Sequence, residues 1–408
     1  MIAVTNAFQY GSPTVATAVA KTLVVLLEQV PFHRLQTGIL NSISDKLLRL
    51  KLEANPVIQI AVLQVCSSLI SIDHTQSSVS QEIRAVFQDF FKMFLVRSFP
   101  NLVSSTSHGT PTATNLIDSN IRYVSIQCLA KLAQLDIGLF MQNVDSSLLK
   151  VFEEVLRSEK DTSLCLHLLR LIKGIGTCGP KSKNDVNVKP WILDKLVHFW
   201  SSFFIRSTIF DYIERRTEAI LQAALCDCLS EVGEVVFSLL PTDRRMLCVT
   251  YLLRKSYMEE DTDSRVVVTS QGKTFSVDSF SVNEFNTPHW TFNTVLSSIS
   301  LFISVRGIGM LVSWPSCYSD SAILVDSAEI LLDVLGRDKD SPIHKNVALS
   351  GSWALANLVD ALARQSKSSS MGSVSKTDYG NIEEVSNLHG DLEFPPHLTL
   401  QLAKVAIR

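Results

Sequence analysis

The sequence predicts an all-α protein, and more narrowly an α-solenoid in which about six to seven helical hairpins stack in a row. One observation is composition: 46% of the 408 residues are hydrophobic and 19% are charged, as in a folded chain with a large core. Gly and Pro number only 16 and 13, which favours long helices over a many-turned β protein. The other two observations are an apolar pattern that recurs along the chain and a polar pattern that accompanies it.

The clearest example of both patterns runs from Asn346 to Arg364. At 100° per residue, one face of a helix here carries an apolar set of residues: Ala348, Gly351, Leu355, Leu358 and Leu362. The opposite face is polar except for one Trp: Ser350, Trp353, Asn357, Asp360 and Arg364. Because Pro is tolerated in the first turn of a helix and Asp or Ser can cap it, Asp340-Ser341-Pro342 is a suitable start.

Six helices, this one included, align on the same pattern. The position of Leu355 is apolar throughout: Cys66, Leu129, Ile172, Leu229, Ile308 and Leu355. The position of Leu358 is apolar as well: Leu69, Leu132, Ile175, Val232, Leu311 and Leu358. The position of Trp353 is polar in the other five helices: Gln64, Gln127, Arg170, Asp227 and Arg306. The position of Ala356 is mostly small, which lets neighbouring helices approach: Ser67, Ala130, Lys173, Ser230 and Gly309.

Stacked amphipathic hairpins require this combination, because a single hairpin cannot bury its apolar face. We expect paired helices over 21–30 and 33–51, 56–72 and 80–99, 120–135 and 146–157, 161–175 and 191–210, 214–232 and 242–257, 293–311 and 319–335, and 346–364 and 395–407. Ser-rich stretches predict loops at 103–115 and 366–376.

The spacing of the aligned helices points to a known class of repeat. The residues at the Trp353 position are separated by 63, 43, 57, 79 and 47 residues. HEAT and armadillo-type hairpins take roughly 40–47 residues, so the longer intervals predict insertions. We therefore expect HEAT-like hairpins over 1–258 and again over 292–408. Between them, residues 259–291 are expected to form an irregular acidic insertion that contains a β-like run, Arg265-Val-Val-Val-Thr269. We expect the last group to continue in a longer protein.

Three segments resemble the central region of the HEAT repeat-containing protein 6 family. They are Arg306-Gly-Ile-Gly-Met-Leu-Val312, Val325-Asp-Ser-Ala-Glu-Ile-Leu-Leu332 and Ser352-Trp-Ala-Leu-Ala-Asn-Leu-Val-Asp360. In that family a similar Arg-Gly-x-Gly helix precedes an Ala-Trp-Ser-Leu-Gly-Asn-Leu helix, whereas this chain has Ala356 where Gly is favoured. The resemblance implies a large HEAT-repeat protein without known enzymatic activity, and it transfers no catalytic residue.

Trp353 and Asn357 form the one motif in the sequence that indicates partner binding. Armadillo nuclear-import adaptors use Trp and Asn at this spacing on several inner helices, where Asn holds a peptide backbone and Trp stacks on a basic side chain. Here one hairpin has the pair, so three interpretations stay open: a Trp shielded by the adjoining hairpin or the 366–376 loop, a local partner contact, or recognition of a basic peptide. The candidate partner-binding residues of the inner face are Arg170, Arg306, Trp353 and Asn357.

No motif predicts catalysis, and we expect no enzyme activity, no cofactor and no metal ion. Gly174-Ile-Gly-Thr-Cys-Gly179 matches a dinucleotide-binding pattern, but it ends a helix, where carbonyl groups and not N–H groups face outward. Gly272-Lys-Thr274 resembles the end of a phosphate-binding loop without its first Gly. Cys226 and Cys228 lie about 200° apart around a helix and cannot share a metal. His167, in a run of Leu, is expected to be a core or hairpin-contact residue.

Net charge and targeting signals limit the partners and the cellular location that we expect. A net charge of −3, from 37 basic and 40 acidic residues, argues against nucleic acid as a partner. The sequence shows no secretory signal, and most of its 8 Cys lie in apolar helical patterns, so we expect an intracellular protein, cytoplasmic and/or nuclear. The apolar run Val295–Trp314 contains Arg306 and predicts a buried helix, not a membrane span.

The acidic run Glu259–Asp263 is expected to be a solvated loop, with a docking or phosphorylation segment as the alternative because Thr262, Ser264 and Ser270 lie in or near it. The sequence as a whole predicts a non-catalytic protein–protein interaction scaffold built on HEAT repeats, with other proteins as partners. The alternative is an armadillo-type transport adaptor that binds basic peptides on its inner face. An enzyme with a site in the insertion is the least supported function.

Overall fold

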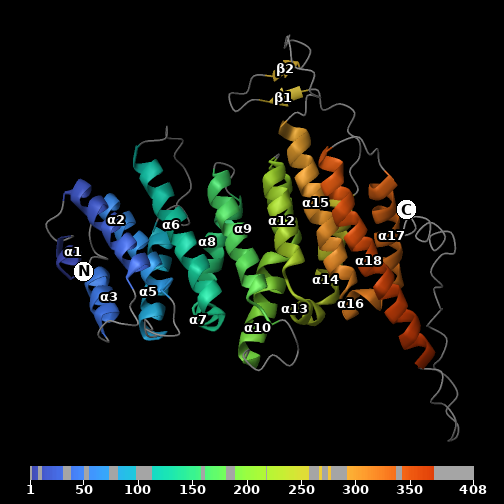
Figure 1. Ribbon diagram of the computed structural model, residues 1–408, viewed down its shortest axis with the longest axis horizontal. Helices are drawn as coiled ribbons and strands as arrows, with labels where there is room; N and C mark the ends of the chain where they lie inside the picture. The colour runs from blue at the N-terminus through green and yellow to red at the C-terminus, as the bar shows by residue number, and fades with distance from the viewer. Residues whose placement is uncertain are drawn as a thin grey trace, which may run out of the picture. The chain divides into compact units, whose positions relative to one another are not determined.

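In the computed structural model, the part of the chain that the structure describes is almost entirely α-helical (Figure 1). The part of the chain that the structure describes comprises residues 2–7, 12–30, 38–49, 55–72, 81–97, 113–157, 161–180, 189–216, 218–256, 266–268, 274–276, 292–336 and 342–371. These residues form eighteen α-helices, one π-helical segment and two three-residue strands. The prediction of an all-α protein is confirmed.

Contacts between Cα atoms divide the chain into two compact units. Unit 1 consists of Met1–Thr217 and Glu231–Arg244, and unit 2 consists of Glu218–Ser230 and Arg245–Arg408. The sequence-based division at residues 258 and 292 is a different partition, and it stays a prediction.

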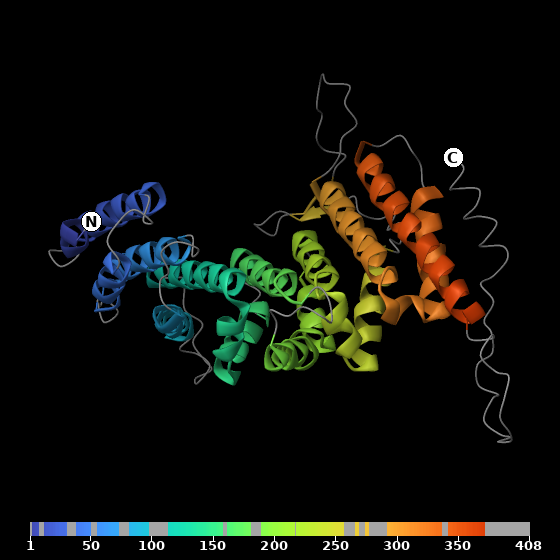
Figure 2. The same ribbon diagram turned by 60° about the horizontal axis from the view of Figure 1, so that its bottom comes forward.

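In unit 1 the long helices pack in two rows. The helices are α1 Ile2–Asn6, α2 Pro13–Gln29, α3 Ile39–Arg49, α4 Pro56–Ile70, α5 Gln81–Arg97, α6 Ala113–Leu135, α7 Ile137–Gln142, α8 Ser146–Arg157, α9 Thr162–Thr177, α10 Pro190–His198, η5 Phe199–Phe204, α11 Ser207–Glu214 and α13 Glu234–Leu239. One row runs α2–α4–α6–α9 and the other α3–α5–α8–α11, with each helix in contact with the next in its row (Figures 1 and 2). The first row holds the first helices of the predicted hairpins.

Unit 2 is centred on α15, which packs between α12 and α18 (Figure 2). Its elements are α12 Ala219–Ser230, most of α14 Thr242–Ser256, β1 Val266–Val268, β2 Thr274–Ser276, α15 Phe292–Val312, α16 Pro315–Tyr318, α17 Ser321–Gly336 and α18 Pro342–Met371. The helix α17 packs against both α15 and α18. The strands pair antiparallel, with Val267 opposite Phe275, so the predicted β-like run is confirmed for β1.

Local sequence explains where several helices begin. Ser12 precedes Pro13 at the start of α2, and its hydroxyl accepts a hydrogen bond from the Val15 N–H at 3.3 Å. Asn55 caps α4 in the same way, through the Val57 N–H at 3.0 Å. The Asp161 carboxylate caps α9 through the Leu164 N–H at 2.9 Å. Short polar side chains at these positions satisfy N–H groups that have no partner within the helix.

The aligned apolar positions form the core. All six residues at the Leu355 position and all six at the Leu358 position are buried, with exposed fractions from 0% to 5%. The residues at the Trp353 position are exposed or half-buried in every one of the six helices. The helical period of the sequence therefore predicted which face of each of these helices is buried.

One detail of the face assigned to α18 is wrong, because Ser350, placed on the polar face, is only 7% exposed. Val347, Ala354 and Ala361, which were assigned to neither face, are also buried. The buried face is turned toward Ala354 because α15 packs closely against that side of the helix. A small Ser tolerates this burial better than a longer polar side chain would.

The predicted helix over 191–210 is interrupted. It consists of α10, the π-helical segment η5 and α11, with Ile205 and Arg206 between the last two. In η5 the Ile205 N–H donates to the Trp200 carbonyl, five residues back, at 2.7 Å. The wider turn accommodates an aromatic cluster in which Phe199 and Phe203 have ring centroids 5.3 Å apart.

Some predicted loops are shorter than expected, since α6 begins at Ala113 and α18 continues to Met371. Four short helices were not predicted: α1, α7, α13 and α16. The acidic run 259–263 with Ser264 and Ser270, and the predicted partner helix 395–407, lie outside the described residues. Among the helices that the structure describes, none is both long enough and apolar enough to cross a membrane.

Candidate functional site

The four candidate partner-binding residues lie on three helices. Arg170 is exposed on α9 in unit 1. Arg306 on α15 and Trp353 on α18 are exposed in unit 2, and Asn357 on α18 is half-buried there. Of the four, the structure brings Trp353 and Asn357 together, on successive turns of α18 beside α15.

Trp353 and Asn357 both contact Gly309 of α15. The Asn357 side-chain amide donates to the Gly309 carbonyl at 3.0 Å. A methyl group on Gly309 would lie 2.7 Å from Trp353 Cζ3 and 2.8 Å from Ala354 Cα. Real side chains do not approach that closely, so the two helices can meet here only because residue 309 is Gly.

This geometry gives the pair a definite structural role. The hydrogen bond from the Asn357 amide to the Gly309 carbonyl links α18 to α15. It also satisfies a polar group that is half-buried in this contact. The Trp353 ring covers Gly309 with one edge and still exposes 42% of its surface. Trp353 therefore keeps a face that a partner can reach, whereas Asn357 already has a partner inside the protein.

Large apolar side chains are exposed on the same helix. Leu349 exposes 72% of its surface and Val359 exposes 46%. Single exposed apolar residues are ordinary, but these two lie on one side of α18 with the small exposed residues Ser352 and Ala356 between them. We call Leu349, Ser352, Ala356 and Val359 the α18 stripe.

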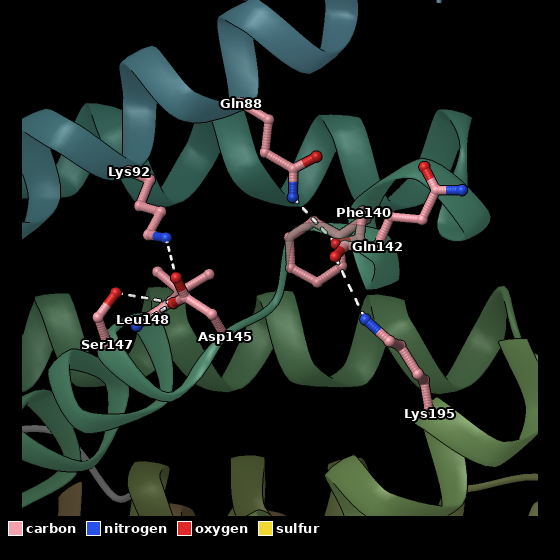
Figure 3. A network of polar contacts seen from close by, with 8 residues as sticks. All are labelled: Gln88, Lys92, Phe140, Gln142, Asp145, Ser147, Leu148 and Lys195. Carbon is pink, nitrogen blue, oxygen red and sulfur yellow. Dashed lines mark hydrogen bonds and ion pairs between the residues drawn. The ribbon is translucent and has the colours of Figure 1, made fainter. Parts of the chain in front are cut away.

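A polar network joins α5, α7, α8 and α10 in unit 1 (Figure 3). Gln88, only 1% exposed, donates from its amide to the Phe140 carbonyl at 3.0 Å. Its amide oxygen accepts from the Asn143 amide at 3.2 Å. The buried Gln88 amide therefore satisfies its own polar atoms while it holds the C-terminal end of α7.

Lys92 and Asp145 form an ion pair in the same network (Figure 3). Asp145 also caps α8, because its carboxylate accepts from the Leu148 N–H at 2.9 Å and from the Ser147 hydroxyl at 2.7 Å. Partial burial raises the pKa of this carboxyl, but the bonds from Lys92, Leu148 and Ser147 outweigh burial and lower the pKa to about 2. Asp145 is thus a carboxylate at neutral pH, and its role is to hold the start of α8.

A second lysine completes the network from the other side. The Lys195 ammonium of α10 donates to the Gln142 carbonyl at 3.2 Å (Figure 3). It also donates to the Met141 carbonyl at 3.0 Å. These carbonyls end α7, where a cation also interacts favourably with the helix dipole. The network fixes the corner between α7 and α8, and each of its charged groups is committed to a helix end.

Arg84 approaches the other end of α7. Its guanidinium lies 4.0 Å from the Asp136 carboxylate, and Asp136 accepts from the Leu139 N–H at 2.9 Å as the cap of that helix. Burial lowers the pKa of Arg84, and the Asp136 charge acts in the opposite direction. The pair is a further brace of α7.

The Gly-rich motif ends α9, as predicted. Its helix runs to Thr177, and the Cys178 N–H donates back to the Gly174 carbonyl at 3.1 Å. A methyl group on Gly176 would lie 2.1 Å from the Glu231 carbonyl oxygen. Gly176 therefore permits a close approach of two backbone segments.

His167 is a helix-contact residue, in agreement with the sequence-based interpretation. Its ring meets Tyr123 of α6 edge to face, with centroids 4.3 Å apart. Partial burial lowers its pKa, the Arg170 charge lowers it further, and Asp161 raises it. The neutral imidazole is favoured by this setting, which suits a packing role.

The cysteines are packing residues as well. All eight lie in the described part of the chain, none of them is in a disulfide, and all but Cys178 are buried. Burial raises the pKa of Cys128 and of Cys317 to about 12, so neither forms a reactive thiolate near neutral pH. Within the part of the chain that the structure describes, no three His, Cys, Asp or Glu side chains gather as metal ligands.

Sequence reasoning missed Gln88 and Asp145 as residues that organise the structure. Gly309, in contrast, was among the small residues expected to let neighbouring helices approach, and α18 does approach it closely. Asp145, directly before Ser146-Ser147 at the start of a predicted helix, had the pattern of a cap. Gln88 carried no such signal, since its partners lie 52 and 55 residues further along the chain.

One comparison with known proteins bears on the N-terminal part of unit 1. Residues 4–79 of this chain match the model of a family described as a domain of unknown function (DUF4042). The matched stretch contains α2, α3 and α4 and none of the four candidate partner-binding residues. The description of the matched family names no activity, so the match gives no function for this stretch.

Proposed function

We propose that this protein is a non-catalytic interaction scaffold, an α-solenoid of HEAT-type hairpins that binds another protein along one face of its first helices. The observation that carries the proposal is the contrast between aligned positions. The residues at the Leu355 and Leu358 positions are buried in six helices, and those at the Trp353 position are exposed or half-buried in the same six. The buried positions are used in packing the helices against one another, so the exposed ladder is the face of these helices that remains open to a partner.

The proposed surface contains residue types suited to protein recognition. Arg170, Arg306 and Trp353 are exposed, and Arg and Trp are enriched among the residues that contribute most to protein–protein binding. Asn357 contributes by holding α18 against α15 and so positions Trp353. The relationship to the HEAT-repeat family is part of this proposal and is supported by the repeat pattern and by residues 306–360.

The test is a comparison of partners captured by the full chain and by a triple variant, Arg170→Ala/Arg306→Ala/Trp353→Ala. We expect the variant to lose one or more partners in affinity purification with mass spectrometry while its melting temperature stays unchanged. A matched control, Arg157→Ala/Arg215→Ala/Leu239→Ala, changes exposed residues outside the aligned ladder and should keep all partners. An identical partner list for the triple variant and the original chain would reject binding by this face.

The alternative function is a transport adaptor that binds basic peptides. It is favoured by the exposure of the Trp353 ring, on which a basic side chain could stack. The bond from Asn357 to Gly309 weighs against it, because the alternative needs that amide for a peptide backbone. Titration with Lys- and Arg-rich peptides decides the matter, and absence of binding at micromolar concentration rejects the alternative.

A further inference from the structure

A second exposed stripe, with the same form as the α18 stripe, lies on α2. Its residues follow one another at spacings of three, four and three, as those of the α18 stripe do: Val15, Ala18, Thr22 and Val25. Val15 exposes 43% of its surface and Val25 exposes 57%, and the two residues between them are also exposed. All four lie on the side of α2 away from its buried residues, such as Leu23. We call these four residues the α2 stripe.

Both stripes can be covered by another helix without loss of hydrogen bonds. The Thr22 hydroxyl donates to the Ala18 carbonyl at 2.9 Å, and the Ser352 hydroxyl donates to the Ala348 carbonyl at 2.8 Å. Each stripe has a large apolar residue at either end and smaller residues between, so a neighbouring helix can come close there. Of the ten large apolar side chains that are exposed in the described part of the chain, four belong to these two stripes. Exposed apolar surface is therefore concentrated on them.

The contact between α15 and α18 shows how a first helix covers such a stripe. Gly309 holds the position on α15 that Ala356 holds in the α18 stripe. The helix α18 covers Gly309 through Ala354, whose Cα would lie 2.8 Å from a methyl group at residue 309. Because each unit of a repeat protein packs on the next in a similar way, Ala356 is expected to be covered by another first helix.

The α2 stripe is the side by which a first helix packs on the one before it. Leu23 is fully buried and precedes Cys66, the aligned residue of α4, by 43 residues, which is a normal repeat length. On this alignment Thr22 corresponds to Ala354 of α18, the residue that approaches Gly309. In α18 this side is buried against α15, whereas in α2 it is exposed. The chain therefore carries the two halves of one kind of contact on two different helices.

Charged side chains beside the two stripes are complementary. Glu28 of α2 is exposed, and the Arg364 side chain of α18 is 56% exposed although it pairs with Asp360. When two parallel helices meet with Thr22 at Ala356, Glu28 and Arg364 lie two residues apart along the axis, or about 3 Å. They also lie on the same side of the contact, like the charged pairs that flank the seam of a parallel coiled coil. Opposite charges at this place favour a second copy of the chain as the occupant.

We infer that the α2 stripe of one copy of the chain packs, in parallel, against the α18 stripe of a second copy. Thr22 then meets Ala356, and Val25 meets Val359. The contact is head to tail because the two stripes lie on different helices, so each copy keeps one stripe for a further copy. It uses residues outside the aligned ladder and does not depend on the proposed scaffold function.

The first experiment measures the mass of the full chain in solution by analytical ultracentrifugation. Contacts below the standard interface size are weak, so concentrations up to about 1 mM are used. We expect the average mass to rise with concentration for the original chain and for the control Val86→Arg, which changes an exposed Val of α5 outside both stripes. Val25→Arg and Ala356→Arg should each stay at the mass of one chain with unchanged melting temperatures, because each loses one half of the contact and both residues are exposed.

An original chain that stays at the mass of one chain would overturn the inference, and would assign the stripes to another segment of the chain or to a separate protein. Mixing the two variants decides which stripes meet. The intact α18 stripe of Val25→Arg should pair with the intact α2 stripe of Ala356→Arg, so the average mass of the mixture should approach that of two chains. Self-association of Val25→Arg alone, of Ala356→Arg alone, or of neither variant even in the mixture would each contradict a head-to-tail contact and overturn the inference.

The direction of the contact is tested by linking two differently tagged copies with a short bis-maleimide. Both copies carry Cys178→Ser, because the other native Cys are buried. Val25→Cys in one copy should link to Val359→Cys in the other. The matched control, Val25→Cys with Leu349→Cys, should link little, because Leu349 lies ten residues, or about 15 Å, away from Val359 along α18. Equal linking of the two pairs, or stronger linking of the control, would mean that the helices do not meet in parallel and would overturn the inference.

Discussion

Unit 1 and unit 2 position their helices by different means. In unit 1, long polar side chains reach from α5 and α10 to the two ends of α7 and the start of α8, as Arg84, Lys195 and Lys92 show. In unit 2, α15 and α18 meet through small residues, and one amide bond from Asn357 locks the contact. Polar bracing spreads its stabilisation over several bonds of modest strength, whereas close packing depends on the space at a single residue.

The difference bears on how each unit carries a binding surface. The close contact of α15 and α18 at Gly309 determines where Trp353 lies on the surface of unit 2. The braced corner of unit 1 depends in part on charge, and its stability should respond to pH and salt. Substitutions in the α15–α18 contact and in the polar corner of unit 1 should therefore lower the free energy of unfolding by different amounts and for different physical reasons.

The largest effect is expected from Gly309→Val in unit 2. The added side chain would push against Trp353 and the backbone of Ala354, and moving α18 away would also break the bond from Asn357. We expect a loss of about 3 kcal/mol in the free energy of unfolding, measured by chemical denaturation. The matched control is Gly336→Val, where a methyl group would meet nothing within 4 Å, with an expected change within about 0.5 kcal/mol. A similar result for both variants would mean that α15 and α18 are not held by close packing.

Gln88→Leu tests the polar corner of unit 1. The substitution fills a similar volume but removes both bonds of a buried amide, leaving Asn143 without one of its acceptors. We expect a loss of about 2 kcal/mol in the free energy of unfolding. Asp89→Ala, at the next and exposed residue of α5, serves as the control and should change little. A Gln88→Leu protein of unchanged stability would show that packing, and not the amide of Gln88, holds this corner of unit 1.

Asn357→Ala separates a structural role from a recognition role. If the amide locks α18 to α15, its loss should lower the free energy of unfolding by about 1 kcal/mol in the absence of any partner. Asp360→Ala, which removes an exposed ion pair with Arg364 four residues further on, should cost less than about 0.5 kcal/mol. Unchanged stability of Asn357→Ala, together with weaker partner binding, would instead assign Asn357 to recognition.

The sequence predicted the helices and their buried faces because both depend on a local and repeated pattern. Apolar residues at helical spacing lie on one face of a helix, and burying them requires that this face turn toward the core. All twelve aligned apolar residues are buried. The predictions failed where packing decided the outcome. The π-helical turn at Phe199–Phe204 follows from contacts among aromatic rings, and the burial of Ser350 follows from the close approach of α15.

For the candidate site too, the sequence predicted which residues are exposed but not which residues they contact. The pattern identified Trp353 as an exposed residue on a polar face, and the structure agrees. The same pattern could not show that Asn357 bonds to Gly309, 48 residues earlier, because that contact depends on how two helices pack. Gln88 and Asp145 were out of reach for the same reason, since their partners come from other helices.

The smallest effect is expected from Asp145→Asn, and it is the one that depends on pH. Asn can still cap α8, so the substitution removes mainly the charge that faces Lys92. The carboxyl side chain is 49% exposed, and solvent screens the pair, so we expect a loss of only about 0.5 kcal/mol at pH 7.

The pKa of Asp145 gives the sign of the pH dependence. Its pKa is about 2 in the folded protein and about 3.9 in an unfolded chain, so its stabilisation is complete above about pH 4 and is lost as the pH falls toward 2. Denaturation at several pH values should therefore show the original chain and Asp145→Asn converging below pH 4. In a Lys92→Met background most of the difference should already be absent at pH 7, and added salt should reduce it. A difference that persisted unchanged at pH 2, or in the Lys92→Met background, would mean that unit 1 is braced here by shape and not by charge, and the contrast with unit 2 would disappear.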